Sequence, residues 1–324
     1  MQTPLMAPLI IPLDVGVDVA KDEVVVACAA GSFAPQAVPN QRAALLKWLK
    51  RLPAGSRIGM EATGTYYETL AGLAHAQGLQ VFVLNPRDVR HYAIGIGRRG
   101  KTDRVDAGVI ARYIAREHKD LHVHVPASPQ QRTLDRLLKR RARLVAIGAT
   151  VKQSLAGLSG VRREIDAIID RIDALIAKID TLVQSWLRQV PAQWRTYGHL
   201  QSIVGIGPLA GAYLANTFAR LPFANVNAFI AHTGLDPRPE DSGQKVGRRR
   251  LSKRGPAELR RLLFNCAMSA AKSKLWKPFY EQQRAKGLSS TAAIVILARK
   301  LARIAFAIFK QQTDFDPQKH TLAA

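Results

Sequence analysis

Two aspartates three residues apart, Asp103 and Asp106, form the first pattern in this sequence that could do chemistry. They lie in KTDRVDA (101–107), and the following AGVIARYIA has the composition of a helix. Residues three apart share one face of a helix, so both carboxylates can point to one place. Acidic residues are also common in the first turn of a helix, where they interact favourably with its dipole. The pair alone leaves a catalytic and a structural interpretation open.

Two acids upstream strengthen the catalytic interpretation. Asp18 lies in the β-rich run LDVGVDV (13–19), and Glu61 ends a short strand that begins at Arg57. In a mixed sheet of the ribonuclease-H type, these acids and the two on the later helix can converge. Four carboxylates suit two divalent ions, Mg²⁺ or Mn²⁺, which can activate a nucleophile and stabilise the leaving oxygen of a phosphodiester. Strand alternation puts Asp14 on the same face as Asp18, so periodicity does not choose between them.

The elements expected around these acids alternate between strands and helices. The runs 13–19 and 23–29 predict a hairpin, and a weaker strand is expected at 32–38. Helix 40–51, strand 57–61, helix 65–77, strand 79–84 and a helix from about 103 to 118 follow. This order predicts an α/β domain with a mixed sheet over 13–126, after an extension, 1–12, without an assigned role.

The charge balance separates the chain into two parts. Its 324 residues include 48 Lys and Arg against 24 Asp and Glu, a formal net charge of +24. Residues 1–125 hold 15 basic and 11 acidic side chains, whereas residues 126–324 hold 33 and 13. Such an excess predicts a polyanionic partner, most commonly nucleic acid. We therefore expect catalytic acids in the first part and phosphate binding in the second.

The cysteines and the N-terminus bear on the compartment. Cys28 and Cys266 lie far apart in apolar surroundings and fit neither a disulfide framework nor a zinc site, which predicts a reducing cytoplasm. No Lys or Arg precedes residue 21, unlike a secretory signal peptide. No charge-free run reaches the length of a membrane span, so we expect no membrane partner.

Residues 127–190 predict a long, all-α arm. Ser128 and Pro129 mark its start, and Ser159-Gly160 would form a turn. Apolar residues three and four apart then form a heptad seam, which predicts a coiled coil or a helical hairpin: Ile165, Ile168, Ile172, Leu175, Ile179, Leu182 and Trp186. The first half is basic and includes Arg140 and Arg141. Two interpretations stay open: an intramolecular hairpin with a solvated face, or a dimerisation arm whose basic side meets nucleic acid.

Two stretches of the last part suit phosphate contacts. Residues 202–216 (SIVGIGPLAGAYLAN) match the helix-hairpin-helix pattern, in which Gly205 and Gly207 allow a tight turn and Pro208 opens the next helix. Backbone N–H groups there can hold a phosphate without reading the base, although a glycine turn between packed helices would look alike.

The second stretch, 234–262, surrounds Ser242 with cations. A Ser-Gly pair alone predicts a turn. Guanidinium groups beside such a serine can, however, neutralise phosphate oxygens. The candidate nucleic-acid-binding side chains here are Arg248, Arg249, Arg250, Lys253 and Arg254, joined by Arg98, Arg99 and Lys101 in the loop before Asp103.

Five segments, in this order, resemble one protein family. They are VGVDVAKDE, MEATGTYYE, NPRDVRHYAIGIGRRGKTDRVDA, IVGIGPLAGAYL and HTGLDPRPEDSGQKVGRRRLSKRGPAELRRLLF. From about residue 13 to 310 the chain resembles the DEDD-type insertion-sequence transposases of the IS110 family, which include bridge-RNA-guided recombinases and the related pilin-gene invertase. The resemblance implies a RuvC-like domain over 13–126, a coiled-coil arm over 127–190 and a helical transposase domain over 191–324.

The resemblance also implies residue roles and partners. Asp18, Glu61, Asp103 and Asp106 fall on the family's Mg²⁺-binding tetrad, and Ser242 on the serine that becomes joined to DNA. The two parts of one site would come from different subunits of a tetramer, a dimer of dimers. A structured RNA would pair with target and donor DNA. A serine hydroxyl is a weak nucleophile at neutral pH, so activation by the metal-bound acids would fill a need.

Other functions fit parts of the same pattern. A RuvC-like nuclease or junction resolvase would use the acids with water and leave Ser242 idle, giving free cut ends instead of protein-linked, rejoined DNA. A basic nucleic-acid scaffold would use the acids structurally and show no Mg²⁺ dependence. An actin-like ATPase shares the strand-Asp start, but its phosphate-binding glycine loops are not evident.

Overall fold

The computed structural model describes residues 11–62, 64–98, 103–238, 247 and 249–321. The chain folds into two compact units, Met1–Pro126 and Ala127–Ala324. The first unit is a mixed α/β structure and the second is mostly helical. The predicted combination of an α/β part with an all-α part is confirmed at this level.

A five-stranded mixed sheet forms the centre of the first unit. Its strands are β1 (Asp14–Val19), β2 (Glu23–Cys28), β3 (Gln36–Pro39), β4 (Arg57–Glu61) and β5 (Gln80–Leu84), in the order β3-β2-β1-β4-β5. β1, β2 and β3 pair antiparallel, whereas β4 runs parallel to both β1 and β5. The hairpin-led mixed sheet expected from the sequence is therefore present, with β3 starting later than predicted.

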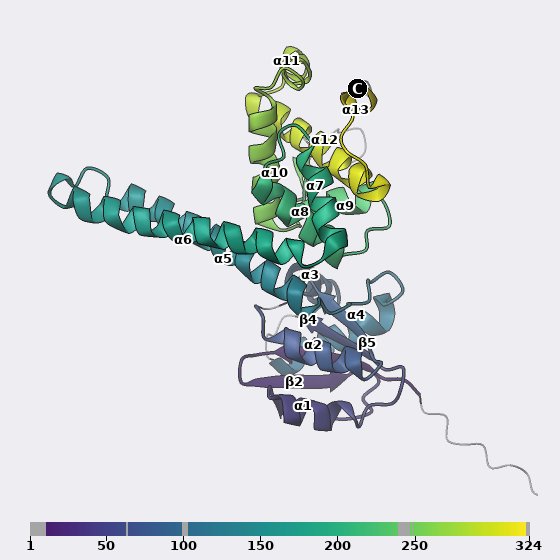
Figure 1. Cartoon of the computed structure of the whole chain (residues 1–324). Coiled ribbons are helices and arrows are strands. Elements are labelled where there is room, and N and C mark those ends of the chain that lie inside the picture. The colour runs from purple at the N-terminus through teal and green to yellow at the C-terminus, as the bar shows by residue number, and fades with distance from the viewer. Residues whose placement is uncertain (1–10, 63, 99–102, 239–246, 248, 322–324) are drawn as a thin grey trace, which may run out of the picture. The chain divides into compact units, whose positions relative to one another are not determined.

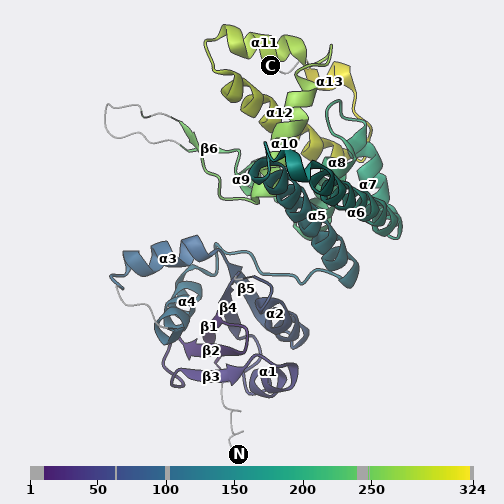
Figure 2. The ribbon, with the colours of Figure 1, turned by 90° about the vertical axis from the view of Figure 1, so that its left-hand side faces the viewer.

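Helices cover both faces of this sheet (Figure 2). α1 (Arg42–Leu49) and α2 (Tyr67–Ala76) pack on the odd-numbered valines of β1, such as Val15 and Val17. α4 (Asp103–Glu117) covers the opposite face and shares a core with α3 (Pro86–Gly95). α3 was not predicted. Its signals were present, because Asn85 caps the helix by accepting a hydrogen bond from the Arg87 backbone at 2.9 Å and Pro86 occupies the first turn.

The second unit begins with a long helical hairpin (Figure 1). α5 (Pro129–Ser154) and α6 (Arg162–Arg188) are joined across a 3₁₀ turn at Ser159–Val161, where the sequence predicted the turn. The remaining elements are α7 (Pro191–Gln201), α8 (Pro208–Arg220), α9 (Val226–Thr233), β6 (Pro237–Arg238), β7 (Arg250–Leu251), α10 (Ala257–Ala270), α11 (Lys277–Ala285), α12 (Ser290–Gln311) and α13 (Pro317–Thr321). Buried residues at the base of the hairpin, such as Leu134 and Leu187, share one core with these helices.

The apolar seam of α6 is split between two faces. Ile179, Val183 and Leu187 are buried, and Ile172 lies over Gly148 of α5, where an added Cβ would be 3.6 Å from its Cγ2. Three members of the predicted seam are instead exposed, each seven residues from the next: Ile168, Leu175 and Leu182, at 50, 46 and 40%. The packed side of α6 uses Ile172, Ile179, Val183 and Leu187. The row formed by Ile168, Leu175 and Leu182 is therefore exposed on the surface of the hairpin.

Two further features concern the whole chain. Cys28 is partly buried and Cys266 is buried, and both are free thiols. Within the part of the chain that the structure describes, no helix combines the length and the apolar character needed to cross a membrane.

Candidate active site

Asp18 and Glu61 lie at the C-terminal ends of neighbouring parallel strands, Glu61 as the last residue of β4 and Asp18 one residue before the end of β1. The register pairs Gly16 with Gly59 and Val17 with Met60, so Asp18 and Glu61 are next in the same register. Because side chains alternate along a strand, both acids share the face of the sheet that carries the two glycines. Both are partly buried.

Helix α4 lies directly on these glycines. A Cβ added to Gly16 would come within 2.1 Å of the Ala107 carbonyl oxygen and 2.2 Å of the Ala111 nitrogen. A Cβ on Gly59 would come within 2.6 Å of Ile114. The absence of side chains at these two strand positions lets the backbone of α4 touch β1, which no other residue would permit.

The direction of α4 follows from its C-terminal end. There Arg57, on the first residue of β4, donates two hydrogen bonds to Asp14 at 2.5 and 3.0 Å and one to Nε2 of His118 at 2.5 Å. His118 follows α4 directly, so the end of the helix lies where β1 and β4 begin. Its first turn, with Asp103 and Asp106, therefore lies toward the acidic ends of both strands.

The same contacts separate the two candidate aspartates of β1. Asp14 is partly buried and ion-paired to Arg57 at the far end of the strand from Glu61. Asp18 lies at the end shared with Glu61 and the start of α4. Sequence alternation did not distinguish the two residues, whereas their neighbours in the fold do.

The donor set at this end of the sheet suits a hard divalent cation, because all four side chains offer carboxylate oxygens. Asp103 is exposed, and Asp106, like Asp18 and Glu61, is partly buried. Among the residues that the structure describes, however, no group of three or more acids, histidines or cysteines is arranged so that it could hold a metal ion. The fold thus places Asp18 and Glu61 at the same strand ends, with the start of α4 toward them, and metal binding by the four acids stays a prediction.

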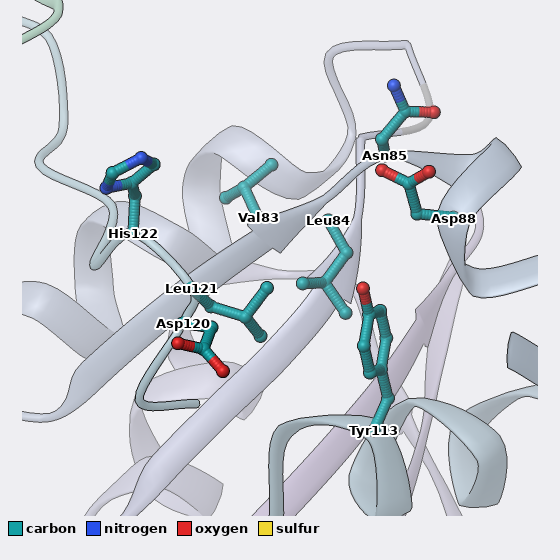
Figure 3. A pocket seen from close by; sticks show the side chains of 8 residues that line it. All are labelled: Val83, Leu84, Asn85, Asp88, Tyr113, Asp120, Leu121 and His122. Atoms are coloured by element: carbon teal, nitrogen blue, oxygen red, sulfur yellow. The ribbon is translucent and has the colours of Figure 1, made fainter. Parts of the chain in front are cut away.

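A hollow of about 200 Å³ lies beside the end of β5 (Figure 3). Leu84, one of its lining residues, pairs with Glu61 in the sheet, so the hollow neighbours the acidic edge. Its lining mixes apolar, aromatic and polar side chains: Val83, Leu84, Asn85, Asp88, Tyr113, Asp120, Leu121 and His122.

The predicted basic residues differ in their exposure. Arg98 and Arg140 are exposed, as are four around β7: Arg249, Arg250, Lys253 and Arg254. Arg141 instead forms a two-pronged ion pair with Asp180 across the hairpin, with N–O distances of 2.5 and 2.9 Å. Its charge is therefore satisfied within the chain. Four predicted site residues lie outside the described residues: Arg99, Lys101, Ser242 and Arg248.

The predicted helix-hairpin-helix segment forms a tight turn between α7 and α8. Gly205 has a φ of +105°, and an added Cβ would come within 3.0 Å of the Cys266 carbonyl oxygen on α10. Gly207 is exposed directly before α8, and Pro208 takes the first helical position. Close packing on α10 explains Gly205 without a ligand, so a phosphate site at this turn stays a prediction.

Two sets of contacts could not be foreseen from the sequence. One is the Arg57, Asp14 and His118 cluster, in which Arg57 is 43 residues from Asp14 and 61 from His118. The other is at the base of the β6–β7 hairpin, where Ser252 contacts Asp236. Isolated Asp, Ser and Arg residues follow no regular spacing in the sequence, so the sequence does not show which of them will pair.

Comparison with known proteins agrees with this architecture. Residues 15–158 match a family described as "Transposase", of the DEDD type, and residues 197–281 match one described as "Transposase IS116/IS110/IS902 family". The α/β unit with acids at one sheet edge, followed by a basic helical unit, is thus that of a transposase, an enzyme that cuts and rejoins DNA. Within that class, the chain belongs to the IS110 family.

Two relatives span most of the chain. It is similar to the pilin gene-inverting protein of Moraxella bovis, at 29% identity over 276 residues, which cover 81% of this chain and 82% of that protein. It is also similar to the transposase for insertion sequence element IS1328 of Yersinia enterocolitica, at 25% identity over 270 residues, or 74% and 79% of the two chains. A DNA-binding role follows from the family.

Proposed function

We propose that this protein is an RNA-guided DNA recombinase of a mobile element, which cuts and rejoins strands through a covalent serine–DNA intermediate. Asp18, Glu61, Asp103 and Asp106 would bind Mg²⁺ or Mn²⁺, and Ser242 would be the nucleophile. The observation that carries the proposal is the shared position of the acids. Supporting it, Asp18 and Glu61 lie at the same ends of two parallel strands, and α4, which begins with Asp103 and Asp106, packs on the same face of the sheet in a DEDD-type transposase.

The proposed chemistry divides between the two units. The Ser242 hydroxyl oxygen would form a bond to phosphorus as the bond from phosphorus to one sugar oxygen breaks. A carboxylate or water would take the serine proton, and the leaving sugar oxygen would gain one. A sugar hydroxyl of the new strand then reverses these changes and frees the serine. When bound, the divalent cation supplies positive charge for the phosphate and leaving oxygens.

The assembly we propose is a tetramer in which one subunit's acids work with another subunit's serine. The exposed row on α6 (Ile168, Leu175 and Leu182) supports an oligomer, because a regular seven-residue apolar spacing on a helix surface is typical of helix pairing between chains. The basic second unit supports binding of target and donor DNA and a structured guide RNA, since Lys and Arg side chains neutralise phosphates and release bound counterions.

Trapping of a protein–DNA adduct tests this proposal. The protein is incubated with end-labelled DNA from the ends of its own mobile element and with RNA transcribed from the adjacent non-coding segment, with Mg²⁺ or with a chelator. We expect a denaturant-resistant adduct that needs Mg²⁺ and maps by peptide mass spectrometry to Ser242. Free cut ends without attached protein would instead identify a nuclease that uses water.

Two substitutions separate the roles. Ser242→Ala should reduce the adduct below detection while RNA affinity stays unchanged, because the hydroxyl is the only group removed. Asp18→Asn should lower the adduct rate by at least about 100-fold and raise the Mg²⁺ concentration for half-maximal rate. Asp14→Asn is the matched control at the other end of β1, and it should leave that Mg²⁺ concentration unchanged. An adduct formed by the Ser242→Ala protein would refute the assignment of the nucleophile.

A further inference from the structure

Asn40 follows β3 directly and joins two other segments of the first unit. Its side-chain nitrogen donates to the Ala20 carbonyl at 2.8 Å and to the Tyr66 carbonyl at 3.4 Å. Its backbone N–H donates to the Asp22 carbonyl at 2.9 Å. One residue therefore contacts the segment that follows β1 and the residue directly before α2. We call these three hydrogen bonds the Asn40 bridge.

The bridge fixes the turn between β1 and β2. Ala20 and Asp22 lie on either side of this turn, and the Ala20 N–H donates to the Glu23 carbonyl at 3.0 Å. Asn40 binds one side of the turn through its backbone and the other through its side chain. Because Ala20 and Asp22 are exposed, burial of their side chains adds little stability here. The position of the turn therefore depends on these hydrogen bonds.

The two polar atoms of the Asn40 side chain are used differently. The nitrogen donates to both carbonyls, whereas the oxygen, Oδ1, is buried and has no hydrogen-bond partner among the residues that the structure describes. A buried acceptor without a donor destabilises the folded state. An apolar side chain would avoid this cost, but it could not donate to the two carbonyls. The donor group therefore explains an asparagine at this position.

The bridge lies next to a candidate catalytic acid. Asp18 is two residues before Ala20, and its pairing with Val25 leads directly into the turn that Asn40 binds. A shift of this turn therefore moves the end of β1 that carries Asp18. We propose that Asn40 is a positioning residue, which fixes the backbone beyond Asp18 and thereby keeps this carboxylate where the proposed reaction needs it. This inference rests on the proposed function.

Amide hydrogen exchange of the full-length protein tests the structural part of this inference. Asn40→Ala removes the side-chain donor, so we expect faster exchange at Ala20, whose N–H is bonded within the turn. Ser56→Ala is the matched control at the other end of β1, because Ser56 is fully buried and its hydroxyl accepts from the Leu13 N–H at 2.9 Å. It should speed exchange at Leu13 and leave Ala20 unchanged. An unchanged exchange rate at Ala20 in Asn40→Ala would refute the inference, whatever the chemistry.

Mn²⁺ binding without nucleic acid, followed by electron paramagnetic resonance of the free ion, tests the effect on Asp18. Asn40→Ala should raise the dissociation constant of Mn²⁺ by about 10-fold, the lower end of the range for residues that orient a metal ligand. Asn40→Leu fills the space without a donor and should raise it equally. Ser56→Ala should lower thermal stability but keep the wild-type constant. Wild-type affinity in Asn40→Leu, or an equal loss in Ser56→Ala, would overturn the proposal.

The adduct assay separates this inference from the proposed function. At limiting Mg²⁺, Asn40→Ala should form the adduct about 10-fold more slowly than the wild type. A wild-type protein that forms no adduct, but loses Mn²⁺ affinity in both Asp18→Asn and Asn40→Ala, would refute the covalent serine and support the Asn40 bridge. Loss of Mn²⁺ affinity in Asp18→Asn alone would refute the bridge and support the acidic metal site. Equal Mn²⁺ affinity of the wild type and Asp18→Asn would refute both.

Discussion

The two units hold their polar residues in different ways. In the first unit, strand ends and one helical turn position the acids, and the side chains of β1 and β4 alternate strictly between two covered faces. In the second unit, the dense contacts near the basic segment join loop atoms, as between Asp236 and Ser252. The first arrangement depends on how closely α4 approaches the sheet, and the second on individual hydrogen bonds. Substitutions should therefore damage the two units in different ways.

The largest effect should come from filling the contact between β1 and α4. Gly16→Ala places a Cβ 2.1 Å from the Ala107 carbonyl oxygen, and this backbone atom moves only if the helix moves. Overpacking of this kind typically costs about 1–3 kcal/mol and sometimes more, so we expect the first unit to lose at least about 3 kcal/mol. Hydrogen exchange in denaturant should show this loss in β1 and β4, while α8 and α12 stay protected.

Gly72→Ala is the matched control within the same unit. Gly72 lies inside α2, and nothing is within 4 Å of an added Cβ. Alanine is favoured over glycine in a helix interior by roughly 0.8–1 kcal/mol, so this variant should be slightly more stable than the wild type. Equal destabilisation by both substitutions would show that glycine flexibility, and not close approach of α4, matters at Gly16.

Regular structure explains why the first unit was largely predictable. Alternating valines mark β1 and β2, and the helical period after Asp103 marks α4, so the positions of Asp18 and Glu61 at strand ends followed from the pattern. The missed helix α3 is short, but Val89, Tyr92, Ala93 and Ile96 follow helical spacing and pack into one core, so its signal was present in the sequence. Periodicity did not choose between Asp18 and Asp14; the family resemblance did, and the structure adds that Asp14 is bound to Arg57, 43 residues away in sequence.

The second unit was predictable in its helices but not in its contacts. The turn of the α5–α6 hairpin lies as expected, whereas the exposed row on α6 shows that a heptad pattern does not reveal which face a neighbouring helix covers. Arg140 and Arg141 looked equivalent in the sequence, yet Arg141 is ion-paired to Asp180. Single hydrogen bonds and ion pairs between distant residues leave no regular spacing in the sequence. Composition therefore predicted a basic surface but not which Lys and Arg side chains are exposed on it.

A partly buried histidine, His232, should make the second unit sensitive to acid. Burial, aided by the charge of Arg220, lowers the pKa of His232 from 6.5 to about 4. Below pH 6.5 the His232 side chain is protonated in the unfolded chain, whereas in the folded chain it stays neutral until about pH 4. The free energy of unfolding therefore falls as the pH decreases over this range. The loss should reach about 2–3 kcal/mol at about pH 4. Denaturant unfolding of the wild type and of His232→Gln, from neutral pH down to about pH 4, measures this loss of stability. All other titratable groups are the same in both proteins, so the difference between the two curves reports His232.

The variant should be less stable at neutral pH, because the ring packs on Phe223 with a centroid distance of 5.2 Å. Its stability should nevertheless fall less steeply with acid than that of the wild type. Parallel curves for the two proteins would mean that His232 keeps an ordinary pKa in the folded state. Hydrogen exchange should place the difference in α9 and its neighbours and not in the sheet of the first unit.

The smallest effect should appear in the salt dependence of DNA binding. The experiment compares the loss of two exposed cations from the second unit with the loss of two from the first. Arg140 and Arg143 are exposed on α5, whereas Arg116 and Lys119 are exposed near the end of α4 that lies away from the acids. Each lost phosphate contact reduces the slope of log affinity against log salt by about 0.9. Arg140→Gln with Arg143→Gln should therefore reduce the slope by about 2, measured by fluorescence anisotropy with a labelled duplex.

The same loss of charge elsewhere should have less effect. Arg116→Gln with Lys119→Gln removes two charges from the first unit and should leave the slope unchanged, because these residues lie at the end of α4 away from the acids that would meet the DNA. Arg141→Gln should mainly weaken the hairpin, since its partner is Asp180 and not a phosphate. Equal slopes for the two double variants would show that DNA responds to total charge alone. In that case the basic face of α5 would be a solvated surface, and nucleic-acid binding would have to be sought around β7 and the turn before α8.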